Sequence, residues 1–95
     1  MTAKEVALHI IDQCPTLKLF EAYMFGSTLY GVGHDIDLLV VGPSGPTLST
    51  LKQEIAVAGR ELPLDVLYMQ PEDAIETEFV NRENCVLLSV IASEI

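Results

Sequence analysis

The sequence is short of positive charge. Lys and Arg together number five among 95 residues, against 14 Asp and Glu, and the net charge at pH 7 is −9. A protein surface of this sign repels the phosphate backbone of DNA and RNA, so we expect no direct binding to a duplex. Binding of a single nucleotide is not excluded, because a metal ion can neutralise its phosphates in place of lysines.

Cysteine is also scarce, and long apolar runs are absent. Cys14 and Cys85 form no C-x-x-C pair and no dense disulfide framework, which favours a reducing compartment. No apolar stretch approaches the roughly 20 residues that cross a bilayer. Residues 2–11 contain an acidic residue and no basic cluster ahead of a long apolar region, unlike a signal peptide. We therefore expect a cytoplasmic protein that does not bind a membrane.

The length and the hydrophobic share bound the architecture. A chain of 95 residues is expected to form one domain over residues 1–95 and to bury about 60–65% of the surface of its unfolded state. Hydrophobic residues make up 49% of the chain and charged residues only 20%, which is a high apolar share for so small a chain. We expect the surplus, with residues 86–91 as its main contributor, to contact a second copy of the chain or another protein.

Hydrophobic periodicity and turn residues predict an α/β fold, with a small mixed sheet flanked by helices. Thr2 and Glu5 match a capping box at the first helix. Glycines in residues 26–34 predict a loop with one helical turn over 27–30. The expected elements are helices over 3–13, 48–61 and 71–81, strands over 17–25, 35–41 and 63–69, and a short apolar segment over 85–90 that forms an edge strand or a docking segment.

Asp35 and Asp37 are the most informative residues, because they open the apolar run 38–41. Side chains two apart along a strand point to the same face, and their Cα atoms lie roughly 6–7 Å apart. Two carboxylates on one face of a largely apolar stretch repel each other unless a cation lies between them. Oxygen ligands select Mg²⁺ or Mn²⁺ over thiophilic metals. The pair therefore predicts a site for a divalent metal.

A glycine-serine turn stands just upstream of this pair. Gly26 and Ser27 offer backbone N–H groups and a hydroxyl, which suit a phosphate. Metal ligands beside a phosphate cradle indicate nucleotide chemistry. HAD-type phosphatases and many glycosyltransferases also carry an Asp-x-Asp pair, but there the pair follows an apolar strand. Here the apolar run follows the pair, and this order argues against both classes.

Asp65 adds a third carboxylate, within the apolar segment 63–69. Burying an unpaired charge there costs several kcal/mol. A metal shared with Asp35 and Asp37 removes the difficulty if the strand that holds Asp65 lies beside theirs. The simpler interpretation is a half-exposed edge strand whose aspartate faces water. Both interpretations stay open at the level of sequence.

Taken together, these features resemble the minimal nucleotidyltransferases, which share the fold of DNA polymerase beta. The likeness covers residues 15–70 and is carried by Gly26, Ser27, Asp35, Asp37 and Asp65. It implies the nucleotidyltransferase fold, with Mg²⁺ or Mn²⁺ held by the three aspartates as catalytic residues. Asp65 would also help to activate the attacking hydroxyl, and the glycine-serine turn would bind the terminal phosphates of the nucleotide.

The resemblance implies transfer of a nucleoside monophosphate from a nucleoside triphosphate, ATP in the first instance, to a hydroxyl acceptor that can belong to a protein. Some minimal nucleotidyltransferases resemble antitoxins encoded beside small helical HEPN-type toxins. The alternative function is therefore a catalytically weak or inactive binding module that acts as an antitoxin-like partner. A homodimer or a complex with such a toxin is expected under either hypothesis.

Two departures from the family pattern concern the triphosphate. Many members carry an arginine shortly after the glycine-serine turn, where Thr28, Leu29 and Tyr30 stand in this sequence. The spacer between the turn and Asp35 is also short. Tyr30 could stack on a base or fill the loop, and His34 could contact a phosphate or face solvent.

Overall fold

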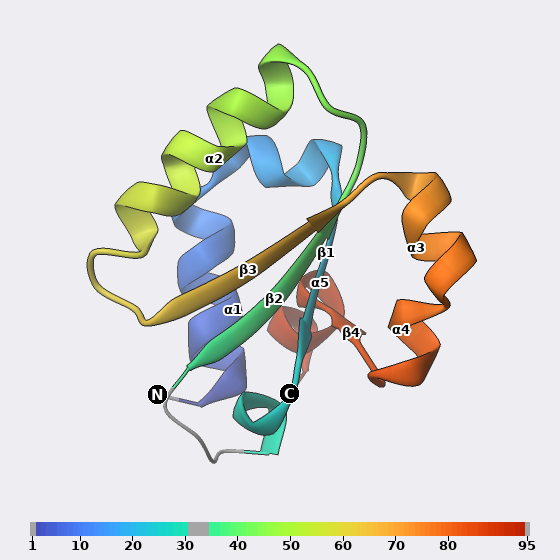
Figure 1. Cartoon of the computed structure of the whole chain (residues 1–95). Helices are drawn as coiled ribbons and strands as arrows, with labels where there is room; N and C mark the ends of the chain where they lie inside the picture. Colours follow the sequence, from blue (N-terminus) through green and yellow to red (C-terminus); the bar gives the residue numbers. More distant parts are fainter. Residues whose placement is uncertain (1, 31–34, 95) are drawn as a thin grey trace.

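A computed structural model describes residues 2–30 and 35–94 of the chain (Figure 1). The helices are α1 (Ala3–Gln13), α2 (Pro46–Ala58), α3 (Pro71–Thr77), α4 (Phe79–Arg82) and α5 (Leu88–Ser93), with short 3₁₀ helices η1 (Pro15–Leu19) and η2 (Ser27–Tyr30). The strands are β1 (Glu21–Phe25), β2 (Ile36–Val41), β3 (Leu64–Met69) and β4 (Val86–Leu87).

The four strands form one mixed sheet in the order β3-β2-β1-β4. β2 and β3 are parallel, whereas β1 is antiparallel to both β2 and β4. The parallel pair needs a crossover, which α2 supplies. This architecture confirms the predicted α/β fold with a small mixed sheet flanked by helices.

The two faces of the sheet have different coverings. On the first, which we call the core face, side chains of β1 and β2 pack with α1, α2 and α5 in one hydrophobic cluster. On the opposite or outer face lie the side chains of alternate residues, such as Tyr23, Phe25, Asp37 and Leu39. The segment α3–α4 lies on the other side of the sheet from α1 and α2 (Figure 1). The edge-to-face packing of Phe79 on Phe25, with ring centroids 5.1 Å apart, ties α4 to the outer face.

The first helix follows the prediction closely. The N–H of Glu5 donates to Thr2 Oγ1 at 3.1 Å, and the N–H of Thr2 donates to Glu5 Oε1 at 3.0 Å, which completes the capping box. The 3₁₀ turn at Ser27–Tyr30 is also confirmed.

The prediction of a strand over residues 17–25 was wrong at its start. Pro15 opens the 3₁₀ helix η1, and the strand begins only at Glu21. Glu54 of α2 accepts hydrogen bonds from the Thr16 N–H at 3.0 Å and from Thr16 Oγ1 at 2.8 Å. Because Leu17 is buried by this turn, tertiary contacts override its local preference for a strand.

The other helix boundaries also differ from the prediction. The second helix spans Pro46–Ala58 rather than 48–61, because Pro46 occupies its first turn and Gly59 follows its end. The single helix expected over 71–81 is broken at Glu78, whose φ of 52° is left-handed. The Arg82 guanidinium donates to the carbonyl of Thr77 at 3.3 Å and satisfies one of the groups left open at the break.

The apolar C-terminal segment combines both predicted roles. β4 pairs with β1 at an edge of the sheet, and α5 then packs on α1. Leu88 and Ile91 are 2% and 3% exposed, so this part of residues 86–91 belongs to the core rather than to a free apolar surface. Leu87 and Val90 remain partly exposed. Among the helices within the described ranges, none is long and apolar enough to cross a membrane.

Candidate active site

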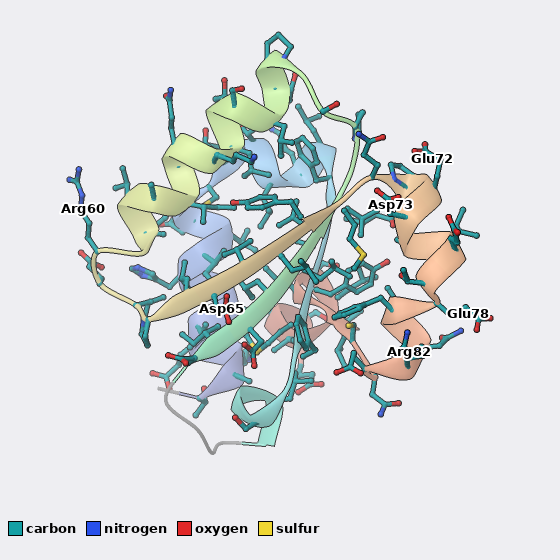
Figure 2. The ribbon with its side chains drawn as sticks, in the orientation of Figure 1. Arg60, Asp65, Glu72, Asp73, Glu78 and Arg82 are labelled. Carbon is teal, nitrogen blue, oxygen red and sulfur yellow. The ribbon has the colours of Figure 1, made fainter. Side chains whose placement is uncertain are left out.

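The sheet register places two of the predicted aspartates side by side. Asp37 of β2 pairs with Asp65 of β3 in the parallel register, so both carboxylates lie on the outer face near the start of their strands. β3, which carries Asp65 (Figure 2), is an edge strand, and the Asp65 side chain is exposed, as the simpler interpretation expected. The sequence argument from a buried unpaired charge at Asp65 was therefore wrong, although the predicted proximity to Asp37 holds.

Asp37 is partly buried and lies beside two other carboxylates. Partial burial raises the pKa of its carboxyl group, and the negative charges of Asp65 and then Asp35 raise it further. Both charges that act on this group are thus carboxylates. A cation placed among them would remove the repulsion, as it would for any cluster of like charges.

Asp35 lies outside the strand that was expected to contain it. β2 begins at Ile36, and Asp35 occupies an exposed bend just before it. It is nevertheless close enough to act on the pKa of Asp37. The three aspartates therefore share one end of the β2–β3 pair.

Gly26 packs directly against this group of carboxylates. Its φ of 79° is left-handed, and a Cβ added to it would lie 2.5 Å from Asp37 Oδ2. Both the backbone conformation and the space thus require glycine. Ser27 follows as the first residue of η2 and is exposed. The glycine-serine turn and the Asp37 carboxylate consequently form adjoining walls of one site.

The chemistry of the donors fits a hard divalent cation, since all three are carboxylates. In the part of the chain that the structure describes, however, no three His, Cys, Asp or Glu side chains are gathered closely enough to hold a metal ion as they stand. Asp35 and Asp65 are both exposed side chains on the rim of the site. The assignment of the three aspartates as metal ligands stays a prediction.

Other polar candidates have structural environments. Cys14 is 1% exposed, and burial together with the charge of Glu54 raises its pKa to about 11, so it is an inert core thiol. Lys52 stacks over the ring of Tyr68 at 4.8 Å. The interpretations of His34 and of the Tyr30 side chain fall outside the described residues.

Sequence reasoning missed the covering of the outer face by α3 and α4. The break at Glu78 turns the chain so that Phe79 reaches Phe25, the neighbour of Asp37 in the β1–β2 register. A left-handed glutamate has no recognisable sequence signal, since glycine or asparagine is the usual residue there. In the sequence, only the aromatic side chains of Phe25 and Phe79 indicated that these segments could pack together.

Comparison with known proteins agrees with this geometry. No curated protein and no solved structure matches the chain significantly. The family model described as "Nucleotidyltransferase domain" matches residues 9–88, which include the glycine-serine turn and all four strands of the sheet. The match confirms the resemblance to minimal nucleotidyltransferases, and the chain belongs to the nucleotidyltransferase domain family.

Proposed function

We propose that the chain transfers a nucleoside monophosphate from a nucleoside triphosphate, with ATP as the first candidate, to a hydroxyl acceptor. Membership of the family supports nucleotidyl transfer in general. The observation that carries the assignment to this site is the in-register pair Asp37 and Asp65, with Asp37 packed against the glycine at position 26. A carboxylate whose pKa is raised by burial and by neighbouring carboxylates, beside a close backbone approach, is typical of a functional site.

The proposed reaction is an in-line displacement. The acceptor oxygen attacks the α-phosphorus, its proton passes to the carboxylate of Asp65, and the bond from the α-phosphorus to the bridging oxygen breaks to release pyrophosphate. Asp65 suits the role of base because it is exposed and an acceptor can reach it. Asp35, Asp37 and Asp65 would hold Mg²⁺ or Mn²⁺, which when bound stabilises the charge on the attacking and leaving oxygens.

The glycine-serine turn would bind the leaving pyrophosphate. The absence of a side chain at Gly26 lets the Asp37 carboxylate lie close to the backbone of the turn, and the exposed hydroxyl of Ser27 can donate to a phosphate oxygen. Among the described residues, the charges that raise the pKa of Asp37 are those of Asp65 and Asp35. Positions 28–30 hold no arginine, and we expect the metal or a partner to supply the cation.

The test of this proposal is binding of a fluorescent ATP analogue in the presence of Mn²⁺. Asp37→Asn should weaken binding by at least about tenfold, whereas Asp12→Asn, which removes an exposed carboxylate on α1, should not. Transfer can then be assayed with α-labelled ATP and the protein encoded by the adjacent gene as acceptor. If both variants bound the ATP analogue with equal affinity, the nucleotide would have to bind outside this site.

The alternative is an antitoxin-like binding module with weak or no catalysis. It is favoured by the lack of a ready metal-ligand group among the described residues and by the two neighbouring carboxylates that raise the pKa of Asp37. An Asp65→Asn variant separates the two functions. If the variant has lost nucleotidyl transfer and still neutralises a partner protein, neutralisation depends on binding and not on catalysis. A chain that binds its partner but never binds Mn²⁺ or nucleotide would favour the module.

Two free thiols at Cys14 and Cys85 support the cytoplasm as the compartment for either function. Nucleoside triphosphates are abundant there.

A further inference from the structure

The outer face carries a second feature, a groove between the sheet and the α3–α4 segment. Its volume is about 550 Å³, and its apolar lining includes Tyr23, Val41, Ile75 and Val80. We call it the α3 groove. Ile75 is 77% exposed, the highest exposure among the large hydrophobic residues of the described chain. A side chain this apolar and this exposed favours an apolar contact.

The α3 groove and the candidate active site lie on one face of the same two strands. Val41 pairs with Glu21 at one end of the β1–β2 ladder, and Asp37 pairs with Phe25 at the other. Val41 and Asp37 are four positions apart along β2, which corresponds to about 13 Å. Phe79 packs edge to face on Phe25, the residue that pairs with Asp37, so α4 covers the outer face near the Asp37 end of the ladder. The residues that line the groove include none of the three aspartates.

The charged side chains that line the α3 groove are acidic. Glu21 and Glu78 line it, and Glu72 and Asp73 lie along the adjoining α3, as Figure 2 shows. None of the five Lys and Arg residues of the chain lines it. The nearest in sequence, Arg82, is directed at the carbonyl of Thr77. The groove is therefore apolar at its base and acidic at its rim.

We propose that the α3 groove docks a basic and apolar segment of a partner protein. Its lining complements Lys or Arg side chains at the rim and an aliphatic or aromatic side chain beside Ile75. A nucleic acid or a nucleotide is disfavoured because the carboxylates repel phosphates. A second copy of this chain is disfavoured because each copy carries a net charge of −9. The proposal concerns binding and does not depend on the proposed transfer reaction.

The test uses two fluorescein-labelled peptides of equal length, one alternating Lys and Leu and the other alternating Glu and Leu. Fluorescence anisotropy with the full chain, without metal or nucleotide, should show binding of the basic peptide only, weakened by salt. Ile75→Ser and the double variant Glu21→Gln with Glu78→Gln should each weaken binding about fivefold or more. All three positions are exposed or on the rim, and thermal unfolding by circular dichroism verifies that the variants fold.

Matched controls remove the same groups elsewhere. Leu19→Ser replaces another exposed hydrophobic residue, 65% exposed in η1, and Asp12→Asn with Glu94→Gln makes the same change in net charge outside the groove. Both controls should bind the basic peptide as the wild type does. Equal weakening in test and control variants would reduce the effect to overall charge and overturn the proposal. A dimer in sedimentation velocity that Ile75→Ser dissolves would assign the groove to a second copy instead.

The outcome is separable from that of the proposed reaction. Asp37→Asn should leave binding of the basic peptide unchanged while it impairs Mn²⁺ and nucleotide binding. A wild-type chain that binds the basic peptide but neither Mn²⁺ nor nucleotide would overturn only the proposed reaction. A wild-type chain that binds Mn²⁺ and nucleotide but not the basic peptide would overturn only the docking proposal.

Discussion

The core face and the outer face of the sheet are made by the same strands and differ in what covers them. On β2, Leu38 and Val40 point into the cluster formed with α1, α2 and α5, whereas Asp37 and Leu39 point to the outer face. The outer face is covered only in part, by α3 and α4. Leu67 of β3 remains 40% exposed there, next to a fully buried Leu39.

The comparison shows how a small chain combines stability with a site. Side chains alternate along a strand, so one face can bury hydrophobic surface while the other bears charged groups without unpaired burial. No polar or charged side chain is buried among the described residues. The aspartates therefore repel one another on the outer face of the sheet, where water and counter-ions weaken the repulsion.

The largest expected difference between the faces is in stability. Leu38→Ala on the core face should lower the free energy of unfolding by about 3 kcal/mol, because it leaves a cavity in a closed cluster. Leu67→Ala on the outer face should lower it by less than about 1 kcal/mol, because the side chain is only partly removed from water. Urea unfolding midpoints measure both. Equal losses would mean that the outer face is as closed as the core.

Replacement of Gly26 should affect both stability and nucleotide binding. Gly26→Ala puts a Cβ into a left-handed residue and against Asp37 Oδ2, with an expected loss of about 1–3 kcal/mol from backbone strain. Gly45→Ala is the matched control, because its φ is 139° but a Cβ there would meet nothing within 4 Å. Both variants should be destabilised, and only Gly26→Ala should lose affinity for ATP with Mn²⁺. Unchanged affinity would separate the glycine-serine turn from the phosphates.

Metal binding should depend on the outer-face aspartates alone. In titration calorimetry with Mn²⁺, Asp37→Asn is expected to lower the affinity at least about tenfold, or 1.4 kcal/mol. Asp12→Asn on α1, which packs on the core face, should leave it unchanged. Binding that survives Asp37→Asn would place the ion elsewhere.

The smallest effect is a pH dependence of stability. Because the pKa of Asp37 is raised in the folded state, folding is favoured by protonation, and this contribution is lost as the pH rises through the folded pKa. Asp37→Asn should therefore raise the melting temperature at pH 7, by a few degrees at most, and should give no gain below about pH 3.5, where the carboxyl is protonated in both states. Thermal melts at the two pH values decide it. An equal gain at both would assign the stabilisation to something other than charge.

Much of the fold was predictable from local pattern. The capping box at Thr2 and Glu5, the apolar run over 38–41 and the turn at Gly26 each depend on residues near one another in sequence. The errors arose where distant contacts decide. Thr16 lies in η1, where Glu54, 38 positions away, accepts its hydrogen bonds. Leu88 and Ile91 are buried because α5 packs against α1.

By itself the sequence determined the kind of chemistry available to this protein. The Asp-x-Asp pair and the glycine-serine turn are defined by spacings of one or two residues, which strand and turn geometry convert directly into neighbouring side chains. Only the tertiary structure decided that β3 lies parallel to β2 in the register that sets Asp65 beside Asp37. It also decided that α3 and α4 leave a groove on the same face. Strand register and helix placement depend on which surfaces bury each other across the whole chain, and no local pattern encodes that choice.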